Sequence, residues 1–191
     1  GYPSPVADLE PGTRLGVYRL EERPGEGGMG VVFRAVREPE GDEVALKVLR
    51  AELSADETFR RRFVHEARAA GEVRHKHLVP ITDAGEAEGR PYLAVAFVRG
   101  RTLETRLEDG PLPIEDLVRV VAHVASGLDA LHAGGIVHRD VKPSNVLVAE
   151  NDHVSVRLFD FGLAQLADAE TLTAVGDVPG TLAYISPERL H

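Results

Sequence analysis

The strongest constraint on the fold is a change of hydrophobic period near the middle of the chain. Up to residue 98 the apolar residues fall in short, β-branched runs separated by Gly, Pro or charged residues, which is typical of an antiparallel meander. From residue 114 they recur at steps of three and four, which predicts one long amphipathic helix ending at Gly134-Gly135. The sequence therefore predicts an α+β protein. The strands expected are residues 17–20, 31–36, 44–49, 78–81, 92–98, 146–148 and 154–158.

One helix interrupts the strands of the first half. Ser54-Ala55-Asp56-Glu57 has the pattern of a capping box, and apolar residues follow at helical spacing from Phe59 to Ala70. This pattern predicts a helix of about four turns.

The composition is that of a globular protein with an acidic surplus. Hydrophobic residues make up 43% and charged residues 28%, enough for a core, and the net charge of −9 argues against nucleic acid or anionic lipid as a partner. The absence of cysteine excludes disulfides, thiolate nucleophiles and cysteine-based metal sites. Residues 1–14, rich in Pro, Gly and Asp, are expected to form a mobile leader before the fold begins near Leu15.

A glycine-rich segment, Gly25-Glu26-Gly27-Gly28-Met29-Gly30, fits the pattern G-x-G-x-x-G. A dinucleotide-binding fold would need a helix directly after the glycines, but residues 31–36 are strand-like. A Walker loop would need Lys and Ser or Thr where Val31-Val32 stands. We therefore expect the glycines in a β-hairpin, where the pattern fits a plain flexible turn as well as a phosphate-binding loop.

Two opposite charges lie on predicted apolar surfaces of the first half. Lys47 is inside the strand 44–49, and Glu66 lies three residues after Phe63 on the apolar side of the predicted helix. Because a buried charge needs a partner, we expect one ion pair between them. The alternative is that each side chain extends separately to solvent.

Polar chemistry is concentrated after the long helix. His138-Arg139-Asp140-Val141-Lys142-Pro143-Ser144-Asn145 combines a base, cations and an amide, and Asp160-Phe161-Gly162 follows the next two strands. A lone Asp-Phe-Gly is more often a turn than a metal site. Its order and spacing relative to the other motifs make it informative. His75 and His77 lack acidic or cysteine partners at metal-binding spacing, which favours surface or packing roles.

In this order the motifs resemble those of eukaryotic-type protein kinases, specifically the bacterial serine/threonine branch. The resemblance covers residues 15–190. It implies a bilobal fold with a β-rich N-lobe at 15–98 containing one helix, and the first part of a helical C-lobe at 99–191, without the remaining helices of that lobe. The matching segments are the glycine loop with Val32, Val44-Ala45-Leu46-Lys47, Glu66, His138 to Asn145, Asp160-Phe161-Gly162 and Ser186-Pro187-Glu188.

The resemblance implies an enzyme that transfers the γ-phosphate of ATP to serine or threonine hydroxyls of proteins, using Mg²⁺ or Mn²⁺. Asp140 would take or orient the proton of the substrate hydroxyl, Lys142 would stabilise the γ-phosphoryl group, and Lys47, fixed by Glu66, would hold the α- and β-phosphates. Asn145 and Asp160 would bind the metal, and His138 would brace the loop. The implied nucleotide-binding residues are Gly25, Glu26, Gly27, Gly28, Met29, Gly30, Val32, Ala45, Lys47, Val95, Ala96, Val98 and Leu147.

Regulation and partners are also implied by the resemblance. Arg139 would bind a phosphate on Thr171 or Thr173 after autophosphorylation in a homodimer, and Thr181 would face the incoming hydroxyl. The substrates would be proteins in the cytoplasm. A membrane would be reached only through segments outside this chain.

Two features depart from the family pattern, and other functions compete with the leading one. Pro24 stands where an aliphatic residue usually covers the adenine, and Ala96 replaces the usual hinge glutamate. The rival functions are a pseudokinase or inactive fragment that binds without phosphoryl transfer, and a small-molecule kinase of the same fold. The pseudokinase function is disfavoured because all the expected polar residues are present, namely Lys47, Glu66, Asp140, Asn145 and Asp160. The small-molecule kinase is disfavoured by Thr181 and Ser186-Pro187-Glu188, which suit a polypeptide substrate.

Overall fold

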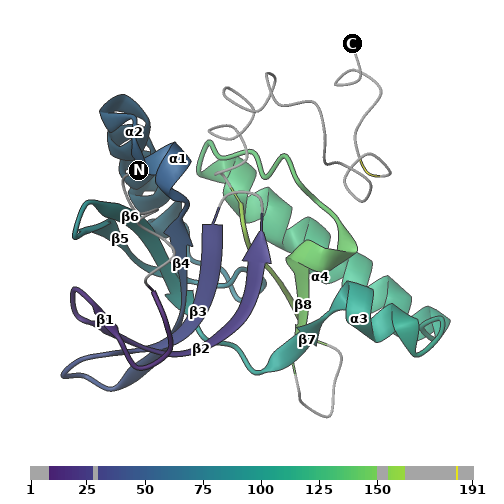
Figure 1. Cartoon of the computed structure of the whole chain (residues 1–191). Helices are drawn as coiled ribbons and strands as arrows, with labels where there is room; N and C mark the ends of the chain where they lie inside the picture. Colours follow the sequence, from purple (N-terminus) through teal and green to yellow (C-terminus); the bar gives the residue numbers. More distant parts are fainter. Residues whose placement is uncertain (1–8, 28–29, 150–154, 162–183, 185–191) are drawn as a thin grey trace. The chain divides into compact units, whose positions relative to one another are not determined.

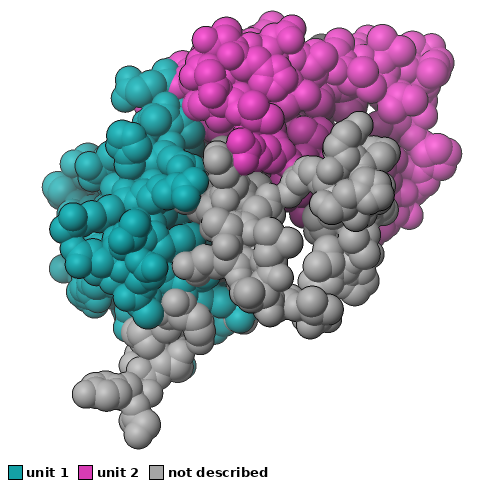
Figure 2. Space-filling model, turned by 90° about the horizontal axis from the view of Figure 1, so that it is seen from above, with its two compact units in different colours: residues 1–72, 80–97 teal, residues 73–79, 98–191 magenta. Residues whose placement is uncertain are grey.

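The structure is a computed structural model that describes residues 9–27, 30–149, 155–161 and 184. The chain divides into two compact units (Figure 2). The first comprises residues 1–72 and 80–97, and the second comprises residues 73–79 and 98–191. The segment 73–79 therefore belongs to the second unit, although the residues before and after it in the sequence belong to the first. The hydrophobic pattern of the sequence does not indicate this division.

A six-stranded antiparallel sheet forms the first unit, in the order β1-β2-β3-β4-β6-β5 (Figure 1). The predicted meander is wrong at one place, because β6 and not β5 lies beside β4. The two helices between β4 and β5 break the meander, and α2 packs against β5 and β6. The strands are β1 (Arg14–Leu15), β2 (Tyr18–Gly27), β3 (Gly30–Arg37), β4 (Asp42–Leu49), β5 (Ile81–Ala87) and β6 (Arg90–Ala96).

The core of this unit follows from the alternation of side chains along the strands. On β3, Val31, Phe33 and Ala35 are buried, whereas the residues between them are only half-buried. Their buried cross-strand neighbours on β4 complete one apolar face. Leu9 is only 4% exposed and packs into this cluster, and Arg14 already begins β1, so residues 9–14 of the predicted leader are held on the sheet.

Helix α2 (Glu57–Gly71) has the predicted apolar face, but its cap differs from the prediction. The predicted capping box at Ser54 is wrong: Ser54 ends the short helix α1 (Ala51–Ser54), and its hydroxyl donates to the carbonyl of Arg50. The N-cap is Asp56, whose carboxylate accepts from the backbone N–H groups of Thr58 at 2.7 Å and Phe59 at 3.1 Å. Asp56 lies two residues closer to the start of α2 than Ser54 does, so its carboxylate reaches the first backbone N–H groups of the helix directly.

The second unit combines helices with a three-stranded antiparallel sheet of order β7-β8-β9. The segment 73–79 runs along β9: the N–H of Leu158 donates to the carbonyl of His77 at 2.9 Å, and that of Val79 to the carbonyl of Leu158 at 2.8 Å. The elements are β7 (Gly100–Thr102), α3 (Leu103–Glu108), α4 (Ile114–Ala133), the 3₁₀ turn η1 (Pro143–Asn145), β8 (Val146–Ala149) and β9 (Val156–Leu158).

Helix α4 has one buried side and one exposed apolar side. Val120, Gly127 and Leu131 are buried, and α4 packs against β9. A Cβ at Gly127 would lie 3.0 Å from the carbonyl oxygen of His77, so glycine permits the close approach of α4 to the segment 73–79. Four apolar residues of the predicted stripe are 45–66% exposed instead: Ile114, Leu117, Val118 and Val121.

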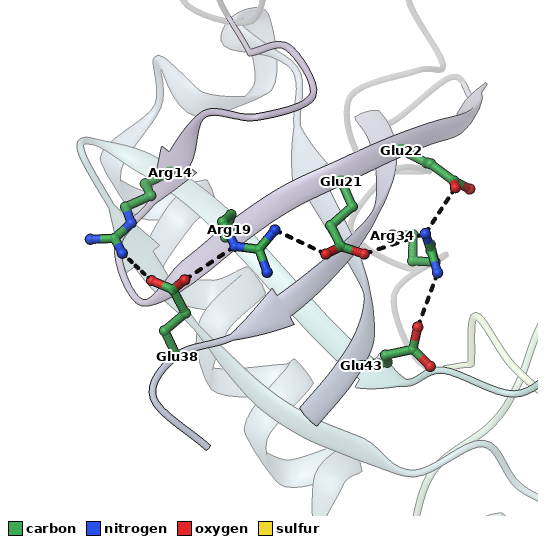
Figure 3. A network of polar contacts seen from close by, with 7 residues as sticks. All are labelled: Arg14, Arg19, Glu21, Glu22, Arg34, Glu38 and Glu43. Atoms are coloured by element: carbon green, nitrogen blue, oxygen red, sulfur yellow. Dashed lines mark hydrogen bonds and ion pairs between the residues drawn. The ribbon is translucent and has the colours of Figure 1, made fainter. Parts of the chain in front are cut away.

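A chain of ion pairs covers the partly exposed side of the first sheet (Figure 3). Its centre is Arg34, which pairs with Glu22 at 2.8 Å, Glu43 at 3.0 Å and Glu21 at 3.3 Å. Glu21 continues the chain to Arg19 at 3.0 Å, and Arg19 and Arg14 both reach Glu38. The network ties β1 to β4, and its side chains range from 23% exposed at Glu21 to 69% exposed at Arg14.

Within the described residues, no helix combines the length and the apolar character needed to span a membrane.

Candidate active site

Strand register places four of the predicted nucleotide residues on one side of the first sheet. Gly25 is paired with Val32, Val32 with Lys47, and Ala45 with Val95. Directly paired residues point to the same side of a sheet, and Ala45 and Lys47 are two residues apart on β4. Val32, Ala45, Lys47 and Val95 are half-buried, so they place small apolar groups and an ammonium group beside the ion pairs of Arg34 on the partly exposed side of the sheet.

The predicted glycine hairpin is confirmed by the pairing of Gly27 with Gly30 at the ends of β2 and β3. A Cβ at Gly30 would lie 2.1 Å from the carbonyl oxygen of Val48, so no larger residue fits without a backbone shift. Pro24 falls within a register shift between Glu22 and Gly25, where the absence of its N–H is tolerated. Gly28 and Met29 lie outside the described residues.

Glu66 forms an ion pair, but its partner is not the one predicted. Its carboxylate accepts from Nε of Arg62 at 2.9 Å, four residues earlier on α2, and its side chain is 27% exposed. Among the described residues the expected pair between Lys47 and Glu66 is therefore not formed. Arg62 competes because the i,i+4 spacing places its guanidinium over the carboxylate. The i,i+4 spacing of Arg62 and Glu66 is the sequence signal for this pair.

The expected hinge segment follows β6 directly. The N–H of Ala96 donates to the carbonyl of Pro80 at 2.9 Å, and that of Phe97 donates to the carbonyl of Glu43 at 3.3 Å. These bonds fix the backbone up to the last residue of the first unit. Val98 is half-buried and belongs to the second unit, as does Leu147 on β8.

In the second unit, Asp140 is the centre of a compact polar group. Its Oδ2 lies 2.9 Å from Nζ of Lys142 and accepts from Nδ2 of Asn145 at 2.8 Å. The same Nδ2 donates to the carbonyl of Asp140 at 2.8 Å, and Asn145 is only 6% exposed. The turn η1, with Pro143 at its start, brings Lys142 and Asn145 to the same carboxylate. Among the described residues, both side-chain contacts of Asp140 fall on Oδ2.

His138 is buried and bonded to the backbone through both ring nitrogens. Nδ1 accepts from the N–H of Asp140 at 3.3 Å, so the neutral ring carries its proton on Nε2, which donates to the carbonyl of Phe159 at 3.1 Å. Burial lowers the pKa of His138, which is 1% exposed. A neutral ring with both nitrogens occupied braces the loop and is not available to exchange protons with a substrate.

The backbone next to Asp160 is tied to the same group. The N–H of Phe159 donates to the carbonyl of Asn145 at 3.2 Å, and the ring of Phe161 is buried, with its centroid 6.2 Å from that of His138. Arg139 and Asp160 have positive φ angles of 66° and 59°, a conformation that non-glycine residues adopt mainly where tertiary contacts impose it.

The donors in this part of the chain suit magnesium. Nδ2 of Asn145 is directed to Asp140, which leaves the amide oxygen as the atom that would bind a cation, and Asp160 supplies a carboxylate. Oxygen donors of these two kinds are those that Mg²⁺ takes in proteins. The other predicted residues of this half, Gly162, Thr171, Thr173, Thr181 and Ser186-Pro187-Glu188, lie outside the described residues.

Comparison with known proteins gives consistent matches. The family model described as "Protein kinase domain" matches residues 18–191. Serine/threonine-protein kinase PknE of Mycobacterium tuberculosis H37Rv is 43% identical over 185 residues, which are 96% of this chain and 32% of that protein. PknH of Mycobacterium bovis is 41% identical over 187 residues, which are 97% of this chain and 31% of that protein. The chain thus spans about a third of the length of these curated relatives.

Solved structures show the same likeness. A crystal structure of the Mycobacterium tuberculosis PknI kinase domain matches with a TM-score of 0.72 and 32% identity, covering 89% of this chain and 68% of that one. A second PknI kinase-domain structure gives a TM-score of 0.71 and 33% identity, covering 81% and 63%.

Proposed function

Because the chain belongs to the protein kinase family, in its bacterial serine/threonine branch, we propose that it transfers the γ-phosphate of ATP to serine or threonine hydroxyls of proteins. Its fold is that of a kinase domain, with a β-rich N-lobe, one long N-lobe helix and part of the C-lobe, as the resemblance implied. The observation that carries the proposal is the carboxylate of Asp140, with two donors on Oδ2 from Lys142 and Asn145.

This arrangement suits proton acceptance from a hydroxyl. With Oδ2 held by two donors, Oδ1 of Asp140 is the oxygen that accepts the proton of the substrate hydroxyl. The hydroxyl oxygen forms the new bond to the γ-phosphorus, the bond between that phosphorus and the bridging oxygen of ATP breaks, and ADP leaves with the electron pair. The two contacts on Oδ2 hold the carboxylate in one orientation, and holding reacting groups in the right geometry lowers the barrier of such a reaction.

The cations of the chain act on the phosphates. Lys142, which lies against Asp140, would interact with the transferring phosphoryl group, and Lys47 would hold the α- and β-phosphates from the half-buried side of the first sheet. Asp160 and Asn145 would hold Mg²⁺, which neutralises phosphate charge when bound.

Regulation belongs to the same proposal. Arg139, next to Asp140, would bind a phosphate on Thr171 or Thr173 placed there by a second copy of the chain, and Thr181 would contact the incoming hydroxyl. The protein would act in the cytoplasm, or at the cytoplasmic face of a membrane in a longer protein.

The test is the transfer of labelled γ-phosphate from Mg·ATP to a generic protein substrate by the 191-residue chain. Asp140→Asn should lower the rate at least about 100-fold, because the amide cannot accept the proton. Asp129→Asn, the same change at an exposed site on α4, is the matched control and should leave the rate within about twofold.

Nucleotide binding without transfer would assign the chain to the rival pseudokinase function. Equal transfer by the unaltered chain and by Asp140→Asn would likewise contradict the proposal.

A further inference from the structure

Three histidines outside the candidate active site gather in the second unit. His75 and His77 come from the segment 73–79, and His123 comes from α4. The rings of His77 and His123 are stacked, with centroids 3.9 Å apart and planes inclined by 18°, and the ring of His75 lies 5.5 Å from that of His77. His77 is only 5% exposed. A stacked imidazole pair is thus packed between α4 and the segment 73–79.

His77 is bonded to β9 from both its ring and its backbone. Nδ1 donates to the carbonyl of Val156 at 3.0 Å, and the carbonyl of His77 accepts from the N–H of Leu158 at 2.9 Å. Leu158 lies two residues before Asp160. The histidine that stacks on α4 therefore also holds the strand that leads into the proposed metal-binding aspartate.

The surroundings of the pair oppose a positive charge. Burial is the main cause that lowers the pKa of both His77 and His123. At His77 the hydrogen bond to the carbonyl of Val156 acts in the opposite direction without reversing the shift, and the charges of Lys76 and, at His123, Arg119 lower the pKa further. The charge of His75 also lowers the pKa of His77. The Nδ1 of His75 accepts from the backbone N–H of His77, and its Nε2 lies 3.4 Å from Oγ of Ser126. On β9 the neighbouring charged residue is Arg157, also a cation.

Protonation of His123 would carry a further cost. In the described part of the structure its Nδ1 is buried without a hydrogen-bond partner. A proton there would be a buried donor without an acceptor, 3.9 Å from a second imidazole ring if the stack persisted. A metal ion is not a suitable partner for the free Nδ1 of His123, because the nitrogens of two stacked rings do not point toward one shared position where an ion could bind. Within the described residues no group of three or more metal-binding side chains is arranged to hold an ion.

We propose that the stacked pair His77 and His123 is a pH-dependent latch that holds β9, and with it the backbone leading to Asp160, on helix α4. His77 is in this sense a positioning residue for Asp160. The latch is closed while both rings are neutral, and it opens as the pH falls below about 6.5, where free imidazole takes up a proton. It is a property of the second unit beyond the proposed phosphoryl transfer, and its tests need no nucleotide.

Hydrogen exchange of single amides tests the latch directly. In the unaltered chain, after correction for intrinsic rates, the protection of the Leu158 and Val79 amides should fall between pH 7.5 and pH 5.5. The fall should approach about tenfold per pH unit for each coupled proton. The amides of the β3–β4 ladder, in the first unit, serve as the internal reference and should keep their protection over the same range.

Matched variants assign the effect to the stack. His123→Phe keeps an aromatic ring on His77 but removes one of the two titratable groups, and it should make the pH profile of the Leu158 amide shallower. His132→Phe makes the same change at an exposed position of the same helix and should keep the original profile. His138, also buried, is present in both variants, so an unchanged profile in His123→Phe would assign the pH dependence elsewhere and overturn the proposal.

A second measurement needs no variant. In a titration of the imidazole resonances, His77 and His123 of the folded chain should have lower midpoints than the imidazoles of the same chain unfolded in urea. Midpoints equal to or above that unfolded value would overturn the latch.

Discussion

In the first unit two tyrosines share one aspartate, whereas the second unit contains, apart from the candidate active site, a pair of stacked histidines. The hydroxyls of Tyr18 and Tyr92 donate to the same oxygen of Asp83 at 2.9 and 3.0 Å. Burial and this carboxylate raise the pKa of Tyr92 to about 12 and raise that of Tyr18 as well. In the second unit burial lowers the pKa of His77 and His123.

The difference teaches that these two clusters contribute stability that is lost at opposite ends of the pH scale. The folded first unit keeps the tyrosine protons above pH 10, where the unfolded chain releases them, so its stability falls as the pH rises. The folded second unit resists protons that the unfolded chain accepts below about pH 6.5, so its stability falls as the pH is lowered.

The apolar groups differ between the units as well. The sheet of the first unit buries a continuous cluster that includes Phe33 and Leu46, both 0% exposed. On α4 of the second unit, Ile114 and Val118 are 66% and 61% exposed although they belong to the helical stripe of the sequence. Burial, and not the sequence period, decides which apolar residues contribute to stability.

The largest effect should come from a core truncation in the first unit. Phe33→Ala removes a fully buried ring from β3 and should lower the free energy of unfolding by about 3–5 kcal/mol. Val118→Ala, a truncation on the exposed side of α4, should change it by less than about 0.5 kcal/mol. Urea denaturation followed by circular dichroism measures both. Equal losses would show that the two apolar surfaces do not differ.

A smaller loss is expected from closing the space at the end of the glycine hairpin. Gly30→Ala places a Cβ against the carbonyl of Val48 and should cost about 1–3 kcal/mol, because backbone has to move. Gly25→Ala, where no atom lies within 4 Å of the added Cβ, is the matched control and should cost less than about 1 kcal/mol. The melting temperatures of the two variants measure these losses. Equal decreases would contradict the close approach of Gly30 to the carbonyl of Val48.

The alkaline side of the comparison is tested by Tyr18→Phe. Without the hydroxyl, the loss of stability with rising pH between about 10 and 12 should become shallower, by up to about 1.4 kcal/mol per pH unit. The loss of stability on lowering the pH from 7 to 5 should stay unchanged in this variant, because we attribute that loss to the protonation of histidines in the other unit. Urea midpoints measured across the pH range give both losses. An unchanged loss at alkaline pH would exclude Tyr18 as its source.

The smallest effect concerns the helix caps. Asp56→Ala removes the acceptor for two amides at the start of α2 and should cost about 1 kcal/mol. Ser54→Ala, at the cap position that the sequence pattern suggested, should cost less. Thermal denaturation compares the two variants, and the reverse order of the losses would restore the predicted capping box.

The sequence identified the elements with strong local signals. The helical spacing of α2 and α4, the β-branched strands β3 and β4, and the glycine hairpin are all dictated by neighbouring residues. Strand β5 was placed too early, at 78–81, because its own residues include Asp83, Gly85 and Glu86. It forms through pairing with β6, which no local pattern reports.

For the site, local patterns located residues but not their contacts. The loop from His138 to Asn145 is compact because Pro143 starts a tight turn, so its members were predicted together and lie together. The partner of Glu66 was mispredicted, because a nearby arginine on the same helix competes with a lysine from a distant strand. The stack of His77 on His123 joins residues far apart in the sequence and depends on the glycine at 127.

The most direct test of the proposed function is the single-turnover rate of γ-phosphate transfer measured as a function of ATP concentration. If the first unit holds the nucleotide and Asp140 of the second performs the transfer, Lys47→Ala should raise the ATP concentration needed for half-maximal rate. Asp140→Asn should lower the maximal rate at least about 100-fold and leave that concentration within about threefold. A maximal rate unchanged in Asp140→Asn, or no transfer by the unaltered chain at any ATP concentration, would contradict it.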